Sequence, residues 1–276
     1  MSAPRYRAVL TGAAGGIGRA IALRLAPLCE TLLLVGRDGA SLAALQQEIE
    51  AAGSRARTVI ADLADTAGRE AVLRAASETG GGIDLLINNA GTGEFAWLAD
   101  QDEAALERIV RVNVLAPIAL TRLLLPLLLV QRESRIVNVG SIFGYLGYPG
   151  YAAYSASKFA LRGFSEALRR ELADGPVRVS YFAPRATRTA MNPAAVSELN
   201  AALGVAMDEP AAVAAALIES LRRPAGERLL GMPERLFARL NQIFPGLVDR
   251  ALRRQLPVIR RHARGAPCPI PQGGKP

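Results

Sequence analysis

The chain has 276 residues, half of them apolar, and carries a formal net charge of +8 at neutral pH. This composition excludes a disordered chain and is ample for the core of one large α/β domain. Neither a secretory signal nor an aliphatic run long enough to cross a bilayer is evident, so we expect a cytoplasmic protein. Two distant cysteines and a single histidine, Cys29, Cys268 and His262, make neither a disulfide framework nor a metal site.

Short apolar runs alternate with longer segments in which apolar residues recur every three or four positions, as at Ile17, Ile21 and Leu25. Continuous apolar strands separated by helices are typical of a parallel sheet covered on both faces. We therefore predict a doubly wound, Rossmann-type α/β fold in a single domain, residues 1–231. Its strands are expected at residues 7–10, 31–35, 55–60, 83–87, 135–139, 177–182 and 228–230.

The pattern changes in the C-terminal extension, residues 232–276. Two amphipathic helices are predicted on either side of Pro245-Gly246, with disorder at the extreme C-terminus. Nine basic residues against two acidic ones supply seven of the eight net charges. The extension can pack on its own domain, cover the substrate cleft, clasp a second subunit or lie on an anionic membrane. Without a recognised binding motif, no nucleic-acid partner is expected.

A glycine turn, residues 11–18, follows the first predicted strand and opens the first helix. Glycine at positions 12, 16 and 18 permits a tight turn, close approach of the backbone to a pyrophosphate and close packing of helix on strand. The helix N-terminus offers free N–H groups to the anion. The turn therefore predicts a dinucleotide site that includes Gly12, Ala14, Gly15, Gly16, Ile17 and Gly18.

The end of the second strand distinguishes the two nicotinamide cofactors. NAD is typically recognised there by an acidic residue that binds the ribose 2′-hydroxyl, whereas this chain reads Gly36-Arg37-Asp38. Gly36 leaves room, and the planar cation of Arg37 suits the 2′-phosphate of NADP. Asp38 is expected to cap the next helix, and Arg37 has the alternative of a solvated loop residue. We predict NADP(H).

Three residues predict the chemistry. Tyr154 and Lys158 are four apart in a predicted helix, residues 151–172, so both project from one face. Ser141 follows the fifth strand, at the edge where open α/β sheets bind ligands. A nearby ammonium lowers the pKa of a phenol, so we predict Tyr154 as proton donor to a carbonyl, Lys158 tuning it and Ser141 orienting the carbonyl oxygen. Each has a structural alternative, such as a helix cap at Ser141.

The same residues exclude a nucleophilic hydrolase. Residues 140–144 do not form a Gly-x-Ser-x-Gly elbow, and the histidine lies in the extension. Tyr151 is set aside as a catalyst because Ser155, not a cation, follows it by four positions.

Over about residues 5–231 these motifs resemble those of the short-chain dehydrogenase/reductase family. Asp62-Leu63 after the third strand and the run from Asn88 through Asn89 and Ala90 to Gly91 after the fourth complete the pattern. The resemblance implies that Asp62 meets the adenine amino group and that residues 88–91 line the cofactor cleft. It further implies that Lys158 holds the nicotinamide ribose, that Asn113 keeps a relay water near this lysine, and that the protein forms a homodimer or homotetramer.

One loop departs from the family pattern. After the sixth strand the chain reads Pro184-Arg185-Ala186-Thr187-Arg188-Thr189, where the family has Gly in place of Arg185. The loop, with Pro184, Thr187 and Thr189, is expected to hold the nicotinamide carboxamide. Arg185 is left with three options: the cofactor phosphates, a substrate carboxylate or solvent.

Aromatic residues in the loops over the same sheet edge predict an apolar substrate pocket, with Phe95, Phe143 and Tyr148 as its lining. We therefore predict an NADP(H)-dependent oxidoreductase that interconverts a lipophilic ketone or aldehyde, for example a β-ketoacyl compound, and its alcohol. The alternative is a non-catalytic NADP-binding sensor or scaffold that acts through the extension. The intact set of Ser141, Tyr154 and Lys158 argues against it.

Overall fold

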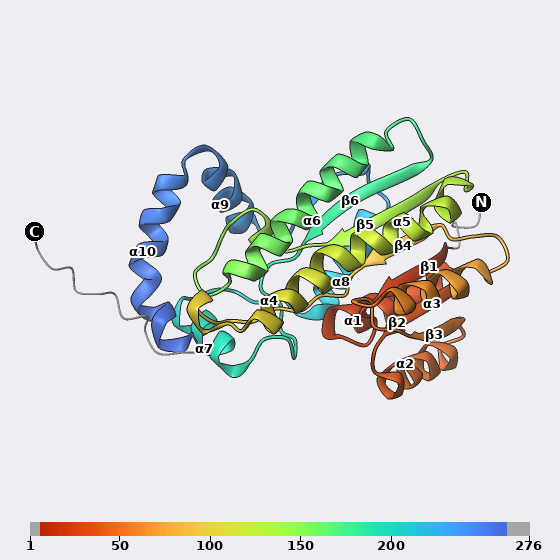
Figure 1. Ribbon diagram of the computed structural model, residues 1–276, viewed down its shortest axis with the longest axis horizontal. Coiled ribbons are helices and arrows are strands. Elements are labelled where there is room, and N and C mark those ends of the chain that lie inside the picture. Colours follow the sequence, from red (N-terminus) through yellow and green to blue (C-terminus); the bar gives the residue numbers. More distant parts are fainter. Residues whose placement is uncertain (1–5, 264–276) are drawn as a thin grey trace, which may run out of the picture.

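A computed structural model describes residues 6–263 and contains every predicted strand. The strands are β1 (Tyr6–Thr11), β2 (Cys29–Gly36), β3 (Ala56–Ile60), β4 (Leu85–Asn88), β5 (Ser134–Val139), β6 (Val177–Ala183) and β7 (Glu227–Leu229). They form one parallel sheet in the order β3-β2-β1-β4-β5-β6-β7 (Figure 1). The Rossmann-type prediction is confirmed, with shifts of one or two residues at some strand ends.

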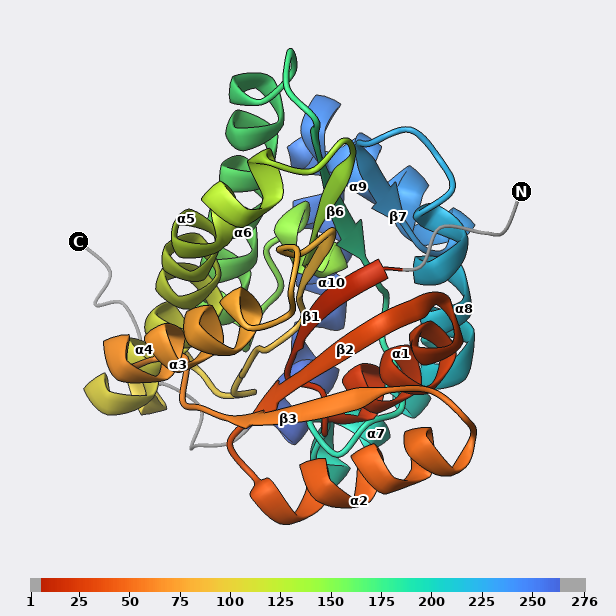
Figure 2. The ribbon, with the colours of Figure 1, turned by 90° about the vertical axis from the view of Figure 1, so that its right-hand side faces the viewer.

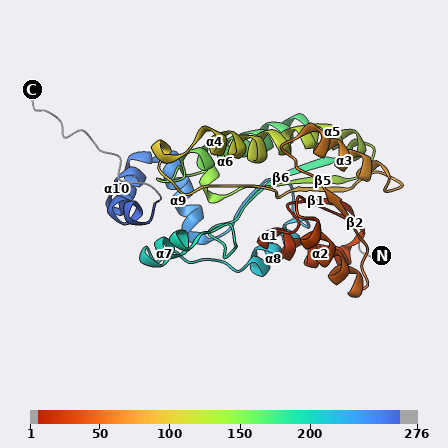
Figure 3. The same cartoon turned by 60° about the horizontal axis from the view of Figure 1, so that its bottom comes forward.

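Helices cover both faces of the sheet. They are α1 (Gly16–Leu25), α2 (Gly39–Ala51), α3 (Thr66–Ser77), α4 (Glu103–Val110), α5 (Ala116–Leu129), α6 (Ala152–Glu171), α7 (Ala194–Ala202), α8 (Pro210–Ser220), α9 (Met232–Ile243) and α10 (Pro245–His262). Figures 2 and 3 show α1, α2 and α8 on one face and α3, α4, α5 and α6 on the other.

Strand β2 illustrates why continuous apolar runs indicate this architecture. Leu32 and Leu34 are fully buried in the core beneath α1, α2 and α8, whereas Leu33 and Val35 are buried in the opposite core with α3 and α5. Successive side chains of a strand point to opposite faces, so both must be apolar when both faces are covered.

The cofactor turn lies where the strand order reverses. β1 pairs with β2 on one side and with β4 on the other, so the loops that follow β1 and β4 diverge from a crevice at the carboxyl ends of the strands. In open α/β sheets this switch point is where ligands bind.

The C-terminal extension packs on its own domain. Ala238 of α9 is buried against Tyr145 and Tyr181, and Ile259 of α10 is buried with Phe95 and the α7 side chains. Figure 1 shows α9 and α10 at the end of the sheet that α7 also covers. The predicted disorder at the extreme C-terminus, and Cys268 with it, lie outside the described residues.

One stretch, Glu103–Leu129, is long and apolar enough for a membrane span by length and composition, with a mean hydropathy of 1.9 in its best window. The sequence analysis did not identify it. Leu120, Leu124 and Leu128 of this stretch are fully buried in the core against the sheet. A core helix of a folded domain satisfies the same criteria, and this one covers a sheet face.

Candidate active site

A cavity of about 800 Å³ opens at the carboxyl ends of β1, β4 and β5. We call it the cofactor cavity. The structure brings together most of the residues that the sequence analysis selected. Its lining includes Gly12, Ala14, Gly15, Gly16, Ile17, Gly18, Gly36, Arg37, Asn89, Ala90, Gly91, Ser141, Tyr154, Lys158, Pro184, Thr187 and Thr189.

The glycine turn has no room for a side chain at Gly12 or Gly18. Gly12 has a φ of +62°, and a Cβ on Gly18 would lie 1.9 Å from the Gly12 carbonyl oxygen. Asn89 braces the turn, because its Nδ2 donates to the carbonyl oxygens of Thr11 and Gly12 at 3.0 and 3.2 Å. At the start of α1 no side chain caps the free amides and no acidic residue stands in the first turn. This backbone cradle fits a pyrophosphate.

At the far end of the cavity, Asp38 caps α2 as predicted, accepting hydrogen bonds from the backbone N–H of Ala40 and Ser41. The Ser41 hydroxyl also donates to the Asp38 carboxylate. This bond above all, together with the two backbone bonds, holds the pKa of Asp38 below its usual value. The Arg37 side chain is 71% exposed and lies 4.0 Å from the Asp62 carboxylate. Asp62 and Leu63 are not part of the cavity lining.

The three predicted catalytic side chains converge at the other end. Ser141 is indeed a helix cap, since its Oγ accepts from the Phe143 N–H at 3.1 Å, and it also hydrogen-bonds the Tyr154 side chain. Lys158, one turn along α6 from Tyr154, is 4% exposed. Its Nζ donates to the Val139 carbonyl oxygen at 3.1 Å and lies 5.6 Å from the centre of the Tyr154 ring.

Burial is the largest influence on the pKa values of Tyr154 and Lys158. Burial raises the pKa of Tyr154 to about 12, opposed by the hydrogen bond with Ser141, and burial lowers the pKa of Lys158 to about 8. The Tyr154 phenol is therefore protonated at neutral pH, which is the form a proton donor needs.

The sequence profile of the short chain dehydrogenases matches residues 7–200. The chain belongs to the short-chain dehydrogenase/reductase family. It is 32% identical to the ketoacyl reductase HetN of Nostoc sp. over 252 residues, which cover 89% of this chain and 87% of that protein. It is also 32% identical to dehydrogenase/reductase SDR family member 7B of Bos taurus over 263 residues, covering 88% and 79% of the two chains.

Solved structures of the family share this fold. A short-chain dehydrogenase/reductase from Burkholderia phymatum, in complex with NAD, superposes with a TM-score of 0.80 at 28% identity, covering 90% of this chain and 96% of its own. A short-chain dehydrogenase from Sphingobium yanoikuyae, in complex with NADPH, gives 0.74 at 28% identity over 89% and 95%. The protein is thus an oxidoreductase of the short-chain dehydrogenase/reductase family, whose members bind a nicotinamide dinucleotide.

Within this family framework, Asn113 sits in a π-helical turn, Arg111–Leu115, between α4 and α5. Its amide is fully used by neighbours: Oδ1 accepts from the Thr92 N–H at 2.8 Å, and Nδ2 donates to the Thr92 carbonyl and to Ser157 Oγ. It does not line the cavity. A Cβ on Gly91 would lie 3.4 Å from Asn113 Oδ1 and 3.6 Å from Lys158 Nζ, so Gly91 stands between the two side chains.

Arg185, at the position of the family glycine, lines the cofactor cavity and is also held by two acidic side chains. Its guanidinium donates to both oxygens of Asp208, at 2.7 and 2.9 Å, and lies 3.4 Å from Glu234 of α9. These partners, Asp208 above all, raise its pKa further. The sequence analysis did not identify these partners, because they lie 23 and 49 residues away and meet Arg185 only in the fold.

Of the three residues predicted to line the substrate pocket, one lies in the wall of the cofactor cavity. Phe95 lines the cavity, whereas Phe143 and Tyr148 do not. Phe143 stacks on Tyr148 with ring centres 5.2 Å apart and meets the Tyr154 ring edge-on at 6.2 Å. Phe143 therefore packs against Tyr154, and Tyr148 packs against Phe143. A loop position in the sequence does not distinguish such packing from pocket lining.

Among the lining residues that the sequence analysis did not select are Tyr151, Met191 and His262. Tyr151 stacks on Phe95 with ring centres 5.0 Å apart, and its position one turn before Tyr154 was an available signal. Met191 follows the loop after β6. His262 comes from the end of α10, so the extension contributes to the wall of the cavity.

Proposed function

We propose that the protein is an NADP(H)-dependent oxidoreductase that interconverts an apolar ketone or aldehyde and the corresponding alcohol. The observation that carries the proposal is the convergence of Ser141, Tyr154 and Lys158 at one end of a cavity whose other end is a glycine cradle. A hydride donor and a proton donor can thus act on the same carbonyl group.

The chain's own residues handle the proton. When bound, the nicotinamide supplies a hydride to the carbonyl carbon. Tyr154 gives its hydroxyl proton to the carbonyl oxygen, and Ser141 donates a hydrogen bond that orients this oxygen. Lys158, as an ammonium, stabilises the phenolate that Tyr154 becomes and is positioned for the nicotinamide ribose. Asn113 holds residue Thr92 beside them and supports the relay that restores the proton.

The preference for NADP(H) rests on Arg37 and Asp38. Since the Asp38 carboxylate is engaged in capping α2, it is not free to bind a ribose 2′-hydroxyl. The exposed guanidinium of Arg37 remains available to a 2′-phosphate. Among the solved relatives one carries NAD and another NADPH, so the argument rests on these two side chains of this chain.

A lipophilic carbonyl, of the β-ketoacyl type, is the proposed substrate. Phe95, Tyr151 and Met191 give the cavity an apolar wall beside Tyr154. The similarity to a protein named ketoacyl reductase points the same way.

Members of the family are generally oligomeric, and we propose a homodimer or homotetramer here. Val110, Leu115 and Phe159, on the helical layer of α4 to α6, are 52%, 47% and 42% exposed, which gives that layer an apolar surface. We place the protein in the cytoplasm. Ile243, Phe244 and Leu247, at the junction of α9 and α10, are exposed among arginines and support peripheral contact with a membrane.

The test is NADPH consumption across β-ketoacyl thioesters, bulky apolar ketones and simple aldehydes. Tyr154→Phe should lower kcat by about 10³-fold while the Kd for NADPH stays unchanged, because only the transferable proton is removed. Tyr148→Phe, which alters the ring stacked on Phe143, should retain activity. Full turnover by Tyr154→Phe would refute the mechanism. Tight NADPH binding by the parent protein without turnover of any substrate would favour the sensor.

A further inference from the structure

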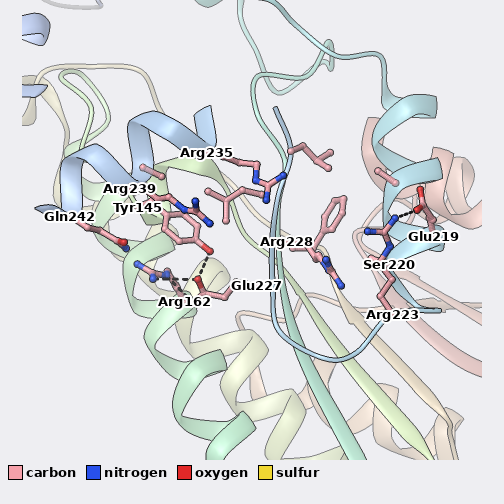
Figure 4. A pocket seen from close by; sticks show the side chains of 15 residues that line it. Tyr145, Arg162, Glu219, Ser220, Arg223, Glu227, Arg228, Arg235, Arg239 and Gln242 are labelled. Carbon is pink, nitrogen blue, oxygen red and sulfur yellow. Dashed lines mark hydrogen bonds and ion pairs between the residues drawn. The ribbon is translucent and has the colours of Figure 1, made fainter. Parts of the chain in front are cut away.

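A second cavity, of about 380 Å³, lies between α8, α9 and the edge strand β7. It shares no lining residue with the cofactor cavity. Five arginines line it, and two glutamates are its acidic residues. Figure 4 shows these side chains reaching in from α6, α8, β7 and α9. We call it the arginine cavity.

Both glutamates are already neutralised. Glu227 accepts hydrogen bonds from Arg162 Nε at 3.1 Å and from the Tyr145 hydroxyl at 2.7 Å. Glu219, near the end of α8, forms an ion pair with Arg223, which follows the helix (Figure 4). Two of the five arginines thus have their counter-charge within the cavity wall.

The other three do not. Arg228 of β7 and Arg235 and Arg239 of α9 form no ion pair with any carboxylate in residues 6–263. The Arg235 guanidinium donates a weak hydrogen bond to the Met232 sulfur at 3.9 Å. Folding therefore brings three uncompensated positive charges from two separate elements to one hollow. Like charges gathered in this way attract a multiply charged anion.

We propose that the arginine cavity binds an oxyanion of phosphate-ester or diphosphate chemistry. Guanidinium groups present planar pairs of N–H donors that match phosphate oxygens, and three of them can satisfy more than one charge. A monocarboxylate would leave most of the cationic charge unbalanced. Apolar wall residues such as Phe182 and Leu230 leave room for a carbon portion beside the anion.

The ligand would join the extension to the rest of the domain. Arg228 belongs to the sheet, whereas Arg235 and Arg239 belong to α9, so one anion bridges the two. Binding to this docked arrangement stabilises it by mass action. Because α9 also carries Glu234, the partner of Arg185 in the loop after β6, the docked extension is in contact with the cofactor cavity.

Inorganic pyrophosphate is the probe, titrated calorimetrically into the full chain saturated with NADPH so that the glycine cradle is filled. The parent protein should bind it. The double variant Arg235→Gln/Arg239→Gln should bind it at least about tenfold more weakly, since two charge-assisted contacts are lost. The matched control, Arg250→Gln/Arg254→Gln, removes the same charge from exposed positions of α10 outside the cavity and should bind within about twofold of the parent.

A second experiment distinguishes a lipid headgroup from a soluble phosphate ester as the source of the anion. Vesicles of phosphatidylcholine with phosphatidic acid are sedimented with each protein, with and without excess pyrophosphate. If the protein pellets with the vesicles, and both excess pyrophosphate and Arg235→Gln/Arg239→Gln abolish this pelleting, the ligand is a lipid headgroup. If the protein binds pyrophosphate but does not pellet, the ligand is a soluble phosphate ester. The proposal is overturned if the parent does not bind pyrophosphate, if the cavity variant binds it equally well, or if the control variant loses as much. The Kd for NADPH should be the same in all three proteins.

Discussion

Arg185 and Asp208 form a two-point ion pair in which Nε and Nη2 each donate to a different carboxylate oxygen, at 2.9 and 2.7 Å. The pair ties the loop after β6 to the segment that leads into α8. A third contact, to Glu234, extends the tie to the C-terminal extension. The arginine that replaces the family glycine therefore fastens three segments at the rim of the cofactor cavity.

Arg185→Met is expected to lower the free energy of unfolding by about 2 kcal/mol, because two part-buried carboxylates then face each other without a cation. Chemical denaturation measures the change. Arg188→Met is the matched control: its pair with Glu209 has side chains 63% and 66% exposed, so we expect a loss of no more than about 0.5 kcal/mol. Equal losses in the two variants would show that Arg185 is no more than a surface charge.

Arg37→Met should raise the Kd for NADPH by about 10-fold to 100-fold and leave that for NADH unchanged, because a charge-assisted contact with the 2′-phosphate is removed. Fluorescence titration with both cofactors gives the ratio. Arg57→Met, which removes an exposed arginine from β3 paired with Glu78, serves as control and should affect neither cofactor. If Arg37→Met weakened the binding of NADPH and of NADH to the same extent, Arg37 would not select the 2′-phosphate.

The sheet and its chemistry could be predicted because the signals are local. Residues 32–35 are all apolar because both faces of β2 are buried. Glycine is needed at position 18 because a Cβ there would lie 1.9 Å from the Gly12 carbonyl oxygen. Tyr154 and Lys158 share a helix, so their spacing alone places them together.

The parts that could not be predicted depend on long-range packing. Arg185 meets Asp208 and Glu234 across the fold, and nothing in its neighbourhood along the chain indicates these partners. His262 lines the cofactor cavity only because Ile259 anchors the end of α10 beside Phe95. An amphipathic pattern specifies which face of a helix is buried but not against what.

Gly18→Ala should abolish NADPH binding and lower the melting temperature. The new Cβ would lie 1.9 Å from the Gly12 carbonyl oxygen and 2.8 Å from the Asn89 amide, so the glycine turn must open. Gly163→Ala, at an exposed position of α6 with nothing within 4 Å, should instead stabilise the protein by about 0.5–1 kcal/mol through helix propensity. Unimpaired NADPH titration of Gly18→Ala would mean that the turn adapts more freely than its packing implies.

Lys158 should make stability depend on pH in the alkaline range. Burial lowers its pKa to about 8, while an unfolded lysine keeps the ordinary value of 10.5, so the unfolded chain binds more protons between these values. The free energy of unfolding therefore rises with pH from about 8 to about 10.5 as the cost of the buried charge disappears. Relative to Lys158→Met, the cofactor-free parent should gain up to about 3 kcal/mol across this window. Urea denaturation at a series of pH values measures the free energy of unfolding of both proteins. A difference between the two free energies that does not change from pH 8 to 10.5 would contradict the prediction.

Ile259 should control the shape of the substrate pocket from within the extension. It is fully buried with Phe95 and Leu199, and its helix carries His262 into the cavity wall. Ile259→Ala removes about 2–4 kcal/mol of packing and loosens the end of α10, so we expect KM to rise severalfold for the longest apolar ketones, with kcat little changed. Leu247→Ala, 51% exposed on the same helix, should leave both constants as they are. Steady-state kinetics with ketones of increasing chain length makes the comparison. If the KM of Ile259→Ala is unchanged at every length, the extension does not affect substrate binding.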